Sequence, residues 1–152
     1  MQKVKIITHS GCDLSYQEIE QYNITMIPDW LIIDGKEYRN NIDIYPEAFY
    51  EYLATNDNLP TSSHPSPSAF MDAFLSASEY EEIIFISLSS KLTGTFNTAT
   101  VAGMALEDEG FSPKLHIYDS AQASFGAALV ILEAAKMAQS GHSAQEIIEE
   151  LD

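Results

Sequence analysis

Small hydroxyl-bearing side chains gather in two segments of this 152-residue chain, at residues 60–67 and 87–98. The second segment contains Thr93-Gly94-Thr95, just before a stretch whose apolar residues have helical spacing. A helix N-terminus presents unpaired N–H groups and about half a positive charge, so it attracts anions. Gly94 lacks a Cβ and lets a ligand approach the backbone, and the hydroxyls of Thr93 and Thr95 can donate to the same anion. These residues predict a site for a small anionic head group.

The same residues also have a purely structural interpretation. Thr93 can cap its own helix, because Thr is among the preferred capping residues. Gly94 can serve close packing of the helix against its neighbours. Residue types and spacing leave the anion site and the helix cap equally open.

Further hydroxyl-rich loops follow other predicted strands. The segment Thr8–Asp13 follows the first apolar run, and Ser120 and Ser124 follow the run at 115–118. In open α/β sheets, ligands bind beyond the carboxyl ends of the strands, where loops and helix N-termini meet. We therefore expect these loops to share one edge of a sheet with Thr93.

The run Ser62-Ser63-His64 raises an enzymatic alternative, a hydrolase or an acyl- or phosphoryl-transfer enzyme. A serine nucleophile needs a base in the right spatial position and a group that orients this base. Residues adjacent in sequence rarely supply that geometry, and the chain has no Gly-x-Ser-x-Gly motif. The enzyme remains an alternative hypothesis.

Neither a metal nor a nucleotide cofactor is predicted. The four histidines are scattered without metal-ligand spacing, and Cys12 is the one cysteine, which argues against a zinc site. His116 falls in a predicted strand, where we expect a core or surface histidine. Neither a Walker-A sequence nor Gly-x-Gly-x-x-Gly occurs, so the usual nucleotide-binding signatures are absent from the sequence.

Charge argues against two classes of partner. The chain has 23 acidic and seven basic residues, for a net charge of −16. Proteins that bind nucleic acids or anionic membrane surfaces need clustered Lys and Arg residues, and this composition does not supply them. We interpret the acidity chiefly as an aid to solubility, with a basic docking partner as the alternative.

The cysteine content and the N-terminus bear on location. A lone cysteine allows no intrachain disulfide, which is typical of a reducing compartment. The apolar run after Lys3 and Lys5 is too short for a signal peptide. No stretch approaches the roughly 20 apolar residues of a membrane span. We expect a cytoplasmic protein.

Apolar periodicity predicts the elements that position these loops. Strands are expected at 4–8, 24–27, 31–33, 36–39, 82–88 and 115–118, with a hairpin turn at Asp34-Gly35. Helix starts are expected at the capping boxes of Ser15 and Ser143, at Pro46, at Ser66-Pro67, near Thr93 and before Ala128. The strand–helix alternation from Glu82 onward predicts βαβ units and a largely parallel sheet flanked by helices, an α/β fold.

Two expectations concern the core. The helix through residues 128–138 is apolar nearly all round, which predicts burial on every side. The aromatic pairs Phe49/Tyr50 and Phe70/Phe74 are expected in the core rather than in a ligand wall.

Taken in order, the motifs of this chain resemble those of the DegV family of bacterial fatty-acid-binding proteins. Residues 8–14, Thr-His-Ser-Gly-Cys-Asp-Leu, are similar to the family's Thr-Asp-Ser-x-x-Asp-Leu, with His9 in place of aspartate. Residues 62–67, Ser-Ser-His-Pro-Ser-Pro, stand where the family has Thr-Ser-Gln-Pro-Ser-Pro. Residues 89–96, Ser-Ser-Lys-Leu-Thr-Gly-Thr-Phe, are similar to its Ser-Ser-x-Leu-Ser-Gly-Thr-Tyr, and residues 38–50 and 119–126 match as well.

This resemblance implies a fold and a set of ligand-binding residues. Residues 1–152 would form the family's N-terminal, Rossmann-like α/β domain and end before its second domain. Ser62 would correspond to the family's carboxylate-binding threonine and Thr93 to its carboxylate-binding serine. The residues expected to support them are Ser63, His64, Gly94, Thr95, Ser120 and Ser124.

The resemblance also implies a role. The chain would bind a long-chain fatty acid and present its carboxylate to a separate ATP-dependent fatty acid kinase, which forms an acyl phosphate. It would then need neither catalytic residues nor a cofactor of its own. A lipid-sensing regulatory module is the alternative, because carrier and sensor need the same pocket.

Overall fold

Two runs of β-branched and apolar residues form the centre of the fold. The computed structural model describes residues 3–152, and every residue of β1 (Val4–His9) is buried in it. β6 (Glu82–Ser87) lies beside β1 and is buried from Ile83 onward. Strands that are buried along their whole length are typical of a parallel sheet covered on both faces.

A parallel sheet with the order β2-β1-β6-β7 is built around this pair within residues 3–152. β2 (Thr25–Ile27) and β7 (Lys114–Asp119) are its edge strands, and all three pairings are parallel. The predicted α/β fold with a largely parallel sheet is confirmed. Because the strands are parallel, their carboxyl ends open at one edge of the sheet.

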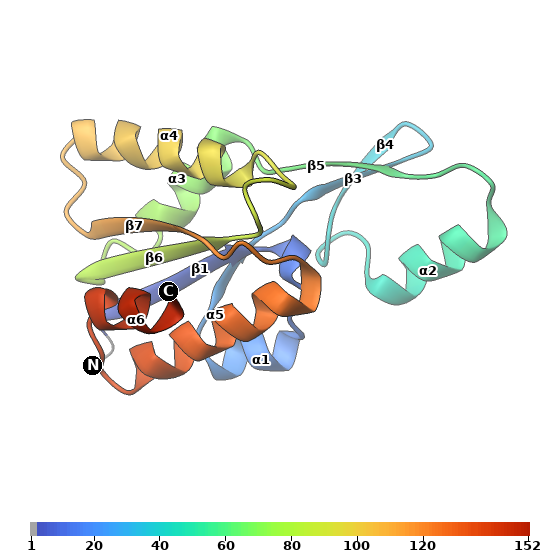
Figure 1. Ribbon diagram of the computed structural model, residues 1–152. Helices are drawn as coiled ribbons and strands as arrows, with labels where there is room; N and C mark the ends of the chain where they lie inside the picture. The colour runs from blue at the N-terminus through green and yellow to red at the C-terminus, as the bar shows by residue number, and fades with distance from the viewer. Residues whose placement is uncertain (1–2) are drawn as a thin grey trace.

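Helices cover both faces of this sheet (Figure 1). α1 (Tyr16–Gln21), α5 (Ser124–Gln139) and α6 (Ala144–Leu151) lie on one side, and α3 (Pro67–Leu75) and α4 (Thr95–Asp108) on the other. Alternate strand residues feed the two cores, because successive side chains point to opposite faces. Ile84 and Ile86 pack with α5 and α6, whereas Ile83 and Phe85 pack with α3 and α4.

A second sheet projects from the body as an arm, which comprises β3, β4, β5 and α2 (Figure 1). β3 (Trp30–Ile33) pairs antiparallel with both β4 (Lys36–Arg39) and β5 (Thr61–Ser63), and α2 (Pro46–Thr55) lies at the far end. Asp34 and Gly35 both have positive φ, 49° and 77°, as the predicted hairpin turn requires.

Three sequence expectations are wrong in detail. The loop expected at 60–67 contains β5, whose exposed polar residues show no strand pattern and depend on pairing with β3. α5 is not buried all round, because Phe125 and Leu129 are 63% and 56% exposed. Phe70 and Phe74 are fully buried as expected, but Tyr50 is 67% exposed and Phe49 is half-buried.

Within residues 3–152, no helix combines the length and the apolar character needed to cross a bilayer.

Phe85 tests the core on the α3–α4 side. Its ring lies 5.2 Å from that of Phe70 and 6.2 Å from that of Phe74, and it is fully buried. Phe85→Ala is expected to lower the free energy of unfolding by about 3–5 kcal/mol in urea denaturation, because it leaves a cavity. Phe125→Ala is the control, with a change within about 0.5 kcal/mol because the ring is largely exposed. Equal losses in the two variants would contradict this core.

Candidate functional site

Three loops meet at the carboxyl edge of the parallel sheet and are tied together by hydrogen bonds. They are the short 3-10 helix η1 (Ser10–Cys12) with Asp13 after β1, residues 88–94 after β6, and residues 120–123 after β7. The Ser89 N–H donates to the carbonyl of Gln122 at 2.8 Å, and the Ser90 N–H donates to the Asp119 carboxylate at 3.1 Å. Ser124 Oγ donates to the Asp13 carboxylate. The expected gathering of these loops is confirmed.

The 88–94 loop delivers Thr93 to the start of α4. Gly94 is the N-cap and α4 begins at Thr95, so Thr93 lies before the cap rather than on it. Thr93 Oγ1 nevertheless accepts from the Thr95 N–H at 3.3 Å and lies 2.7 Å from Thr95 Oγ1. Thr95 is fully buried, whereas Thr93 is half-buried and Gly94 exposed. Thr93 therefore accepts a hydrogen bond from the first turn of α4 while its side chain is still partly accessible. This is compatible both with a structural role at the helix start and with an anion site.

His64 joins the arm to this helix start. Its Nε2 lies 3.0 Å from Thr98 Oγ1, and a Cβ added at Gly94 would lie 3.3 Å from the His64 ring. The absence of a Cβ at Gly94 thus lets an imidazole lie against the first turn of α4. Ser62 precedes His64 by two residues and Thr93 precedes Gly94 by one, so this contact draws their two segments together.

Ser62 and Ser63 lie on β5 and are both exposed. Ser62 stands opposite Leu31 of β3, and Ser63 stands opposite Trp30. Neighbouring strand residues point to opposite faces, so only one of these hydroxyls can face the same side as His64. That residue is Ser62, two positions before His64.

Ser120 and Ser124 serve the third loop internally. Ser120 is buried and its Oγ accepts from the Gln122 N–H at 3.2 Å. Ser124 begins α5 with φ of 50°, and Ala121 has φ of 52°. Positive φ is strained for both residue types, so the Asp13–Ser124 bond helps to hold an unfavourable backbone. Both serines bond within or between the loops instead of joining Thr93 and His64.

Asp119 is one of the charged residues of this edge, with Asp13 and Lys91. Partial burial raises the pKa of its carboxyl, but hydrogen bonds from the Ser90 and Ala121 amides and the nearby Lys91 charge outweigh this effect. The net result is a lowered pKa, so the carboxylate holds the 88–94 and 120–123 loops while it is ionised.

The enzymatic alternative lacks its central contact. His64 Nε2 is engaged by Thr98 Oγ1, and within the described residues neither Ser62 nor Ser63 forms a hydrogen bond with an imidazole. The same described part of the chain holds no group of three or more His, Cys, Asp or Glu side chains arranged for a metal ion.

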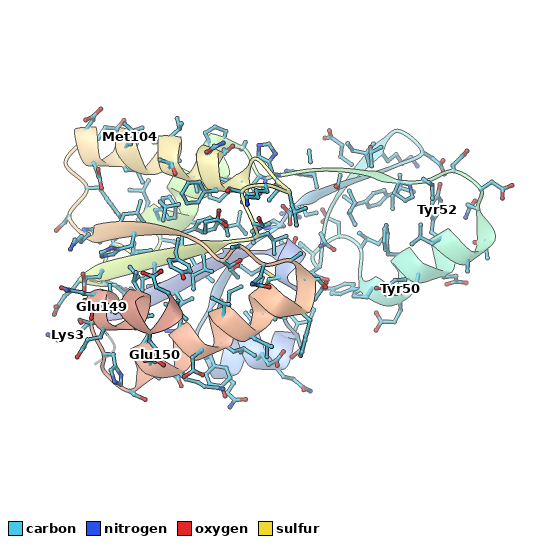
Figure 2. All side chains as sticks on the ribbon, in the orientation of Figure 1. Lys3, Tyr50, Tyr52, Met104, Glu149 and Glu150 are labelled. Carbon is cyan, nitrogen blue, oxygen red and sulfur yellow. The ribbon has the colours of Figure 1, made fainter. Side chains whose placement is uncertain are left out.

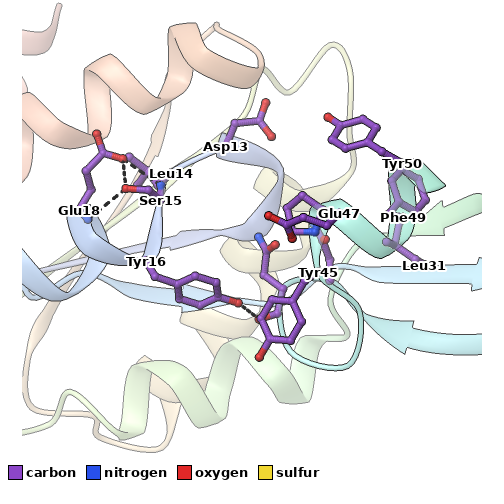
Figure 3. A pocket seen from close by; sticks show the side chains of 13 residues that line it. Asp13, Leu14, Ser15, Tyr16, Glu18, Leu31, Tyr45, Glu47, Phe49 and Tyr50 are labelled. Atoms are coloured by element: carbon purple, nitrogen blue, oxygen red, sulfur yellow. Dashed lines mark hydrogen bonds between the residues drawn. The ribbon is translucent and has the colours of Figure 1, made fainter. Parts of the chain in front are cut away.

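A cavity of about 710 Å³ lies between α1 and the arm, and the sequence did not reveal it (Figure 3). Its apolar wall is formed by Leu14, Leu31, Tyr45, Pro46, Phe49 and Tyr50. Tyr16 OH donates to the Asn41 carbonyl at one side, and the Tyr16 and Tyr45 rings lie 6.0 Å apart. The one available signal was the adjacent pair Phe49-Tyr50, which the pattern assigned to the core.

The contact of His64 with α4 yields a structural prediction. Gly94→Ala places a methyl group against the ring, and Thr98→Val removes its hydrogen-bond partner. Both variants are expected to weaken the contact of the exposed imidazole with α4 and to shift its Cε1–H signal in NMR spectra towards that of a histidine without a hydrogen-bond partner. Unchanged His64 signals in both variants would contradict the contact, and Thr100→Val, whose hydroxyl bonds to Phe96 within α4, is the control.

The Asp119 carboxyl yields a pH prediction. Its pKa is lower in the folded chain than in the unfolded one, so its stabilising effect is complete above the unfolded value near 3.9 and is lost as pH falls through the folded value. Amide protection of Ser90 and Ala121 in hydrogen exchange should fall across that acidic window. Asp119→Ala should cause the same loss at pH 6, whereas the exposed Asp72→Ala should not. Full protection in Asp119→Ala would contradict this account.

Comparison with known proteins identifies the family. The family model described as "Uncharacterised protein, DegV family" matches residues 3–152. A DegV domain-containing protein of Clostridium perfringens is 37% identical over 153 residues, which cover 99% of this chain and 52% of that protein. A DegV domain-containing protein of Listeria monocytogenes is 38% identical over 149 residues, which cover 97% of this chain and 52% of that protein. The chain thus spans about half the length of these relatives.

Solved structures agree. DegV of Bacillus subtilis, described as a fatty acid binding protein, superposes with a TM-score of 0.87 at 27% identity, over 99% of this chain and 53% of that one. A stearic acid-binding protein of Eubacterium ventriosum superposes with a TM-score of 0.86 at 27% identity, over 98% of this chain and 52% of that one. The Streptococcus pneumoniae Fatty Acid Kinase B3 protein, loaded with linoleic acid, shares the fold at 22% identity, with a TM-score of 0.78 over 98% and 53%. On the family match and these likenesses, the chain belongs to the DegV family.

Proposed function

We propose that this chain binds a long-chain fatty acid and holds its carboxylate with the hydroxyls of Ser62 and Thr93. The observation that carries the proposal is the contact of His64 with Gly94 and Thr98, which draws the arm segment of Ser62 to the helix start after Thr93. Family relatives described as fatty-acid-binding and stearic acid-binding support the ligand class.

The physical requirement for such a site is local donors. A carboxylate is expensive to remove from water unless several donors meet it, and charge-assisted hydrogen bonds are the stronger kind. The net charge of −16 supplies no long-range attraction for an anion. Two hydroxyls, the positive end of α4 and the exposed backbone at Gly94 supply the compensation.

The cavity is the proposed place of the acyl chain. Ser62 stands directly opposite Leu31 in the arm, so their side chains share one face with Cβ atoms about 5 Å apart. Leu31 lines the cavity, whose volume is about 710 Å³. Each buried CH₂ group contributes about 0.8 kcal/mol, so the tail would supply most of the affinity.

We propose that these residues form only part of the binding pocket. The chain spans about half the length of its relatives, and residues of a second domain would complete the pocket. We therefore expect weak binding, with exposed apolar residues such as Phe125 and Leu129 favouring self-association.

We further propose the carrier role, in which an ATP-dependent kinase acts on the bound carboxylate. This step comes from the resemblance of the motifs at residues 8–14, 62–67 and 89–96 to those of the family. A lipid-sensing module is the competing role. If a kinase captured with the chain forms acyl phosphate only when fatty acid is added, the carrier role is favoured. If the captured kinase forms no acyl phosphate, the sensor role is favoured.

The head-group site is tested by removing its two hydroxyls. Binding of stearate is measured by isothermal titration calorimetry, because Trp30, the one tryptophan of the chain, stands opposite Ser63 and so lies on the face of the arm away from Ser62 and Leu31. Ser62→Ala/Thr93→Ala is expected to weaken the affinity for stearate by about tenfold or more, since each hydrogen bond to a charged group contributes about 1.5–3 kcal/mol.

The matched control removes two hydroxyls that bond within helices. These are Ser76, bonded to the Ala73 carbonyl, and Thr100, bonded to the Phe96 carbonyl. Ser76→Ala/Thr100→Ala should leave the affinity unchanged. An unchanged affinity in Ser62→Ala/Thr93→Ala would place the head group elsewhere, and absence of stearate binding by the wild-type chain would contradict fatty-acid binding.

A further inference from the structure

A buried imidazole links the bases of the two segments that carry Ser62 and Thr93. His9 is the last residue of β1 and is 2% exposed. Its Nδ1 lies 3.1 and 3.0 Å from the two Asp29 carboxylate oxygens, and its Nε2 accepts from the Leu88 N–H at 3.3 Å. Asp29 directly precedes β3 of the arm, and Leu88 begins the 88–94 loop.

The chemistry of these partners selects one form of the ring. A carboxylate only accepts, so Nδ1 must carry a proton, and a backbone N–H only donates, so Nε2 must offer a lone pair. The neutral Nδ1–H tautomer alone satisfies both. A second proton on Nε2 would set an N–H against the Leu88 N–H and remove that bond.

The surroundings hold Asp29 in place for this task. Ser10 Oγ donates to the Asp29 carboxylate at 3.0 Å and accepts from the Asp29 N–H at 2.9 Å. Asn40, from the chain following β4, donates to the same Ser10 hydroxyl at 3.1 Å. The network therefore fastens both ends of the arm's hairpin to the carboxyl end of β1.

Gly11 completes the fit on the side of Leu88. A Cβ at this position would lie 2.8 Å from Leu88 Cδ1 and 3.3 Å from His9 Cε1. A larger residue here would therefore require the Leu88 side chain and the His9 ring to move. The ring of Phe85 lies 6.4 Å from that of His9, which places the imidazole against the core of the sheet.

We propose that His9 is a positioning residue for the carboxylate site. Its Nδ1–H tautomer anchors the Leu88 amide and the base of the arm to one buried ring, and so sets the distance between Thr93 on the loop and Ser62 on the arm. The consequence for ligand binding rests on the proposed function, whereas the anchor itself does not.

The anchor is tested first without ligand. In a chain labelled with ¹⁵N-histidine, long-range ¹H–¹⁵N correlation at neutral pH is expected to show the Nδ1–H tautomer for His9. The Leu88 amide should be protected from hydrogen exchange. An Nε2–H tautomer, or an unprotected Leu88 amide, would overturn the inference.

Variants then separate positioning from simple packing. Gln can present an acceptor where Nε2 lies; it loses the Nδ1–H donor, but Ser10 Oγ still bonds to Asp29 and holds the base of the arm. Asn reaches only the Nδ1 position and leaves the Leu88 amide without its acceptor. His9→Gln should retain the calorimetric affinity for stearate within about threefold, and His9→Asn should weaken it about tenfold, the loss of a hydrogen bond of about 1.5 kcal/mol. The Thr93 and Gly94 amide signals should shift in the Asn variant alone. Equal behaviour of the two variants in affinity and amide signals would overturn the positioning role.

The control is His142→Gln, at the turn between α5 and α6. His142 Nδ1 lies 3.1 Å from the Met137 carbonyl, and this turn adjoins Glu82 at the amino end of β6. It should change neither the affinity nor the Thr93 signal. If the wild-type chain has the expected tautomer but binds no stearate, the proposed function is overturned and the anchor is retained. If it binds stearate but His9 has the Nε2–H tautomer, the anchor is overturned and the proposed function is retained.

Discussion

The parallel pairing of β1 with β6 is the constraint on which the rest of the structure depends. Its register sets Val4 against Glu82 and Ile7 against Phe85, so the two strands end together. The pairing of β6 with β7 continues this alignment as far as Ser87 and Asp119. Three loops rich in small polar residues therefore meet at one edge, where short hydrogen bonds can tie them. No loop needs a long excursion to reach this edge, and the buried strands keep it rigid.

The arm is held much less firmly than the sheet. Its residues are mostly exposed or half-buried, and β5 is a strand only through its pairing with β3. The side-chain connections described above, Asp29 with His9 and His64 with Thr98, fasten it to the body just before β3 and just after β5, so both lie at its base. In Figure 2 the side chains of Tyr50 and Tyr52 lie on the arm, far from Glu149 and Glu150 on α6. A ligand that bridges Ser62 and Thr93 would add a further connection beside that of His64 with Thr98.

Local sequence signals predicted much of the fold because each has a local physical cause. The capping boxes of Ser15 and Ser143 form as expected, and Asp34-Gly35 makes the hairpin turn. The features that escaped prediction depend on partners distant in sequence. β5 is a strand because it pairs with β3, and residues of α1 and α2 together line the cavity. His9 is held by Asp29 and Leu88, which are 20 and 79 positions away in the sequence. Motif order supplied Ser62 and Thr93 as a pair; spacing alone could not, because 31 positions separate them in the sequence.

The central claim is that Ser62 and Thr93 stabilise an ionised carboxylate. Carbon NMR of carboxyl-labelled oleate bound to the chain, followed as a function of pH, measures this directly. Hydrogen bonds to the charged form lower a carboxyl pKa. The bound carboxylate is therefore expected to remain ionised at a lower pH than oleate in neutral lipid vesicles, and Ser62→Ala/Thr93→Ala is expected to remove that difference. A bound carboxyl group that titrates as it does in vesicles, with or without the two hydroxyls, would contradict the account.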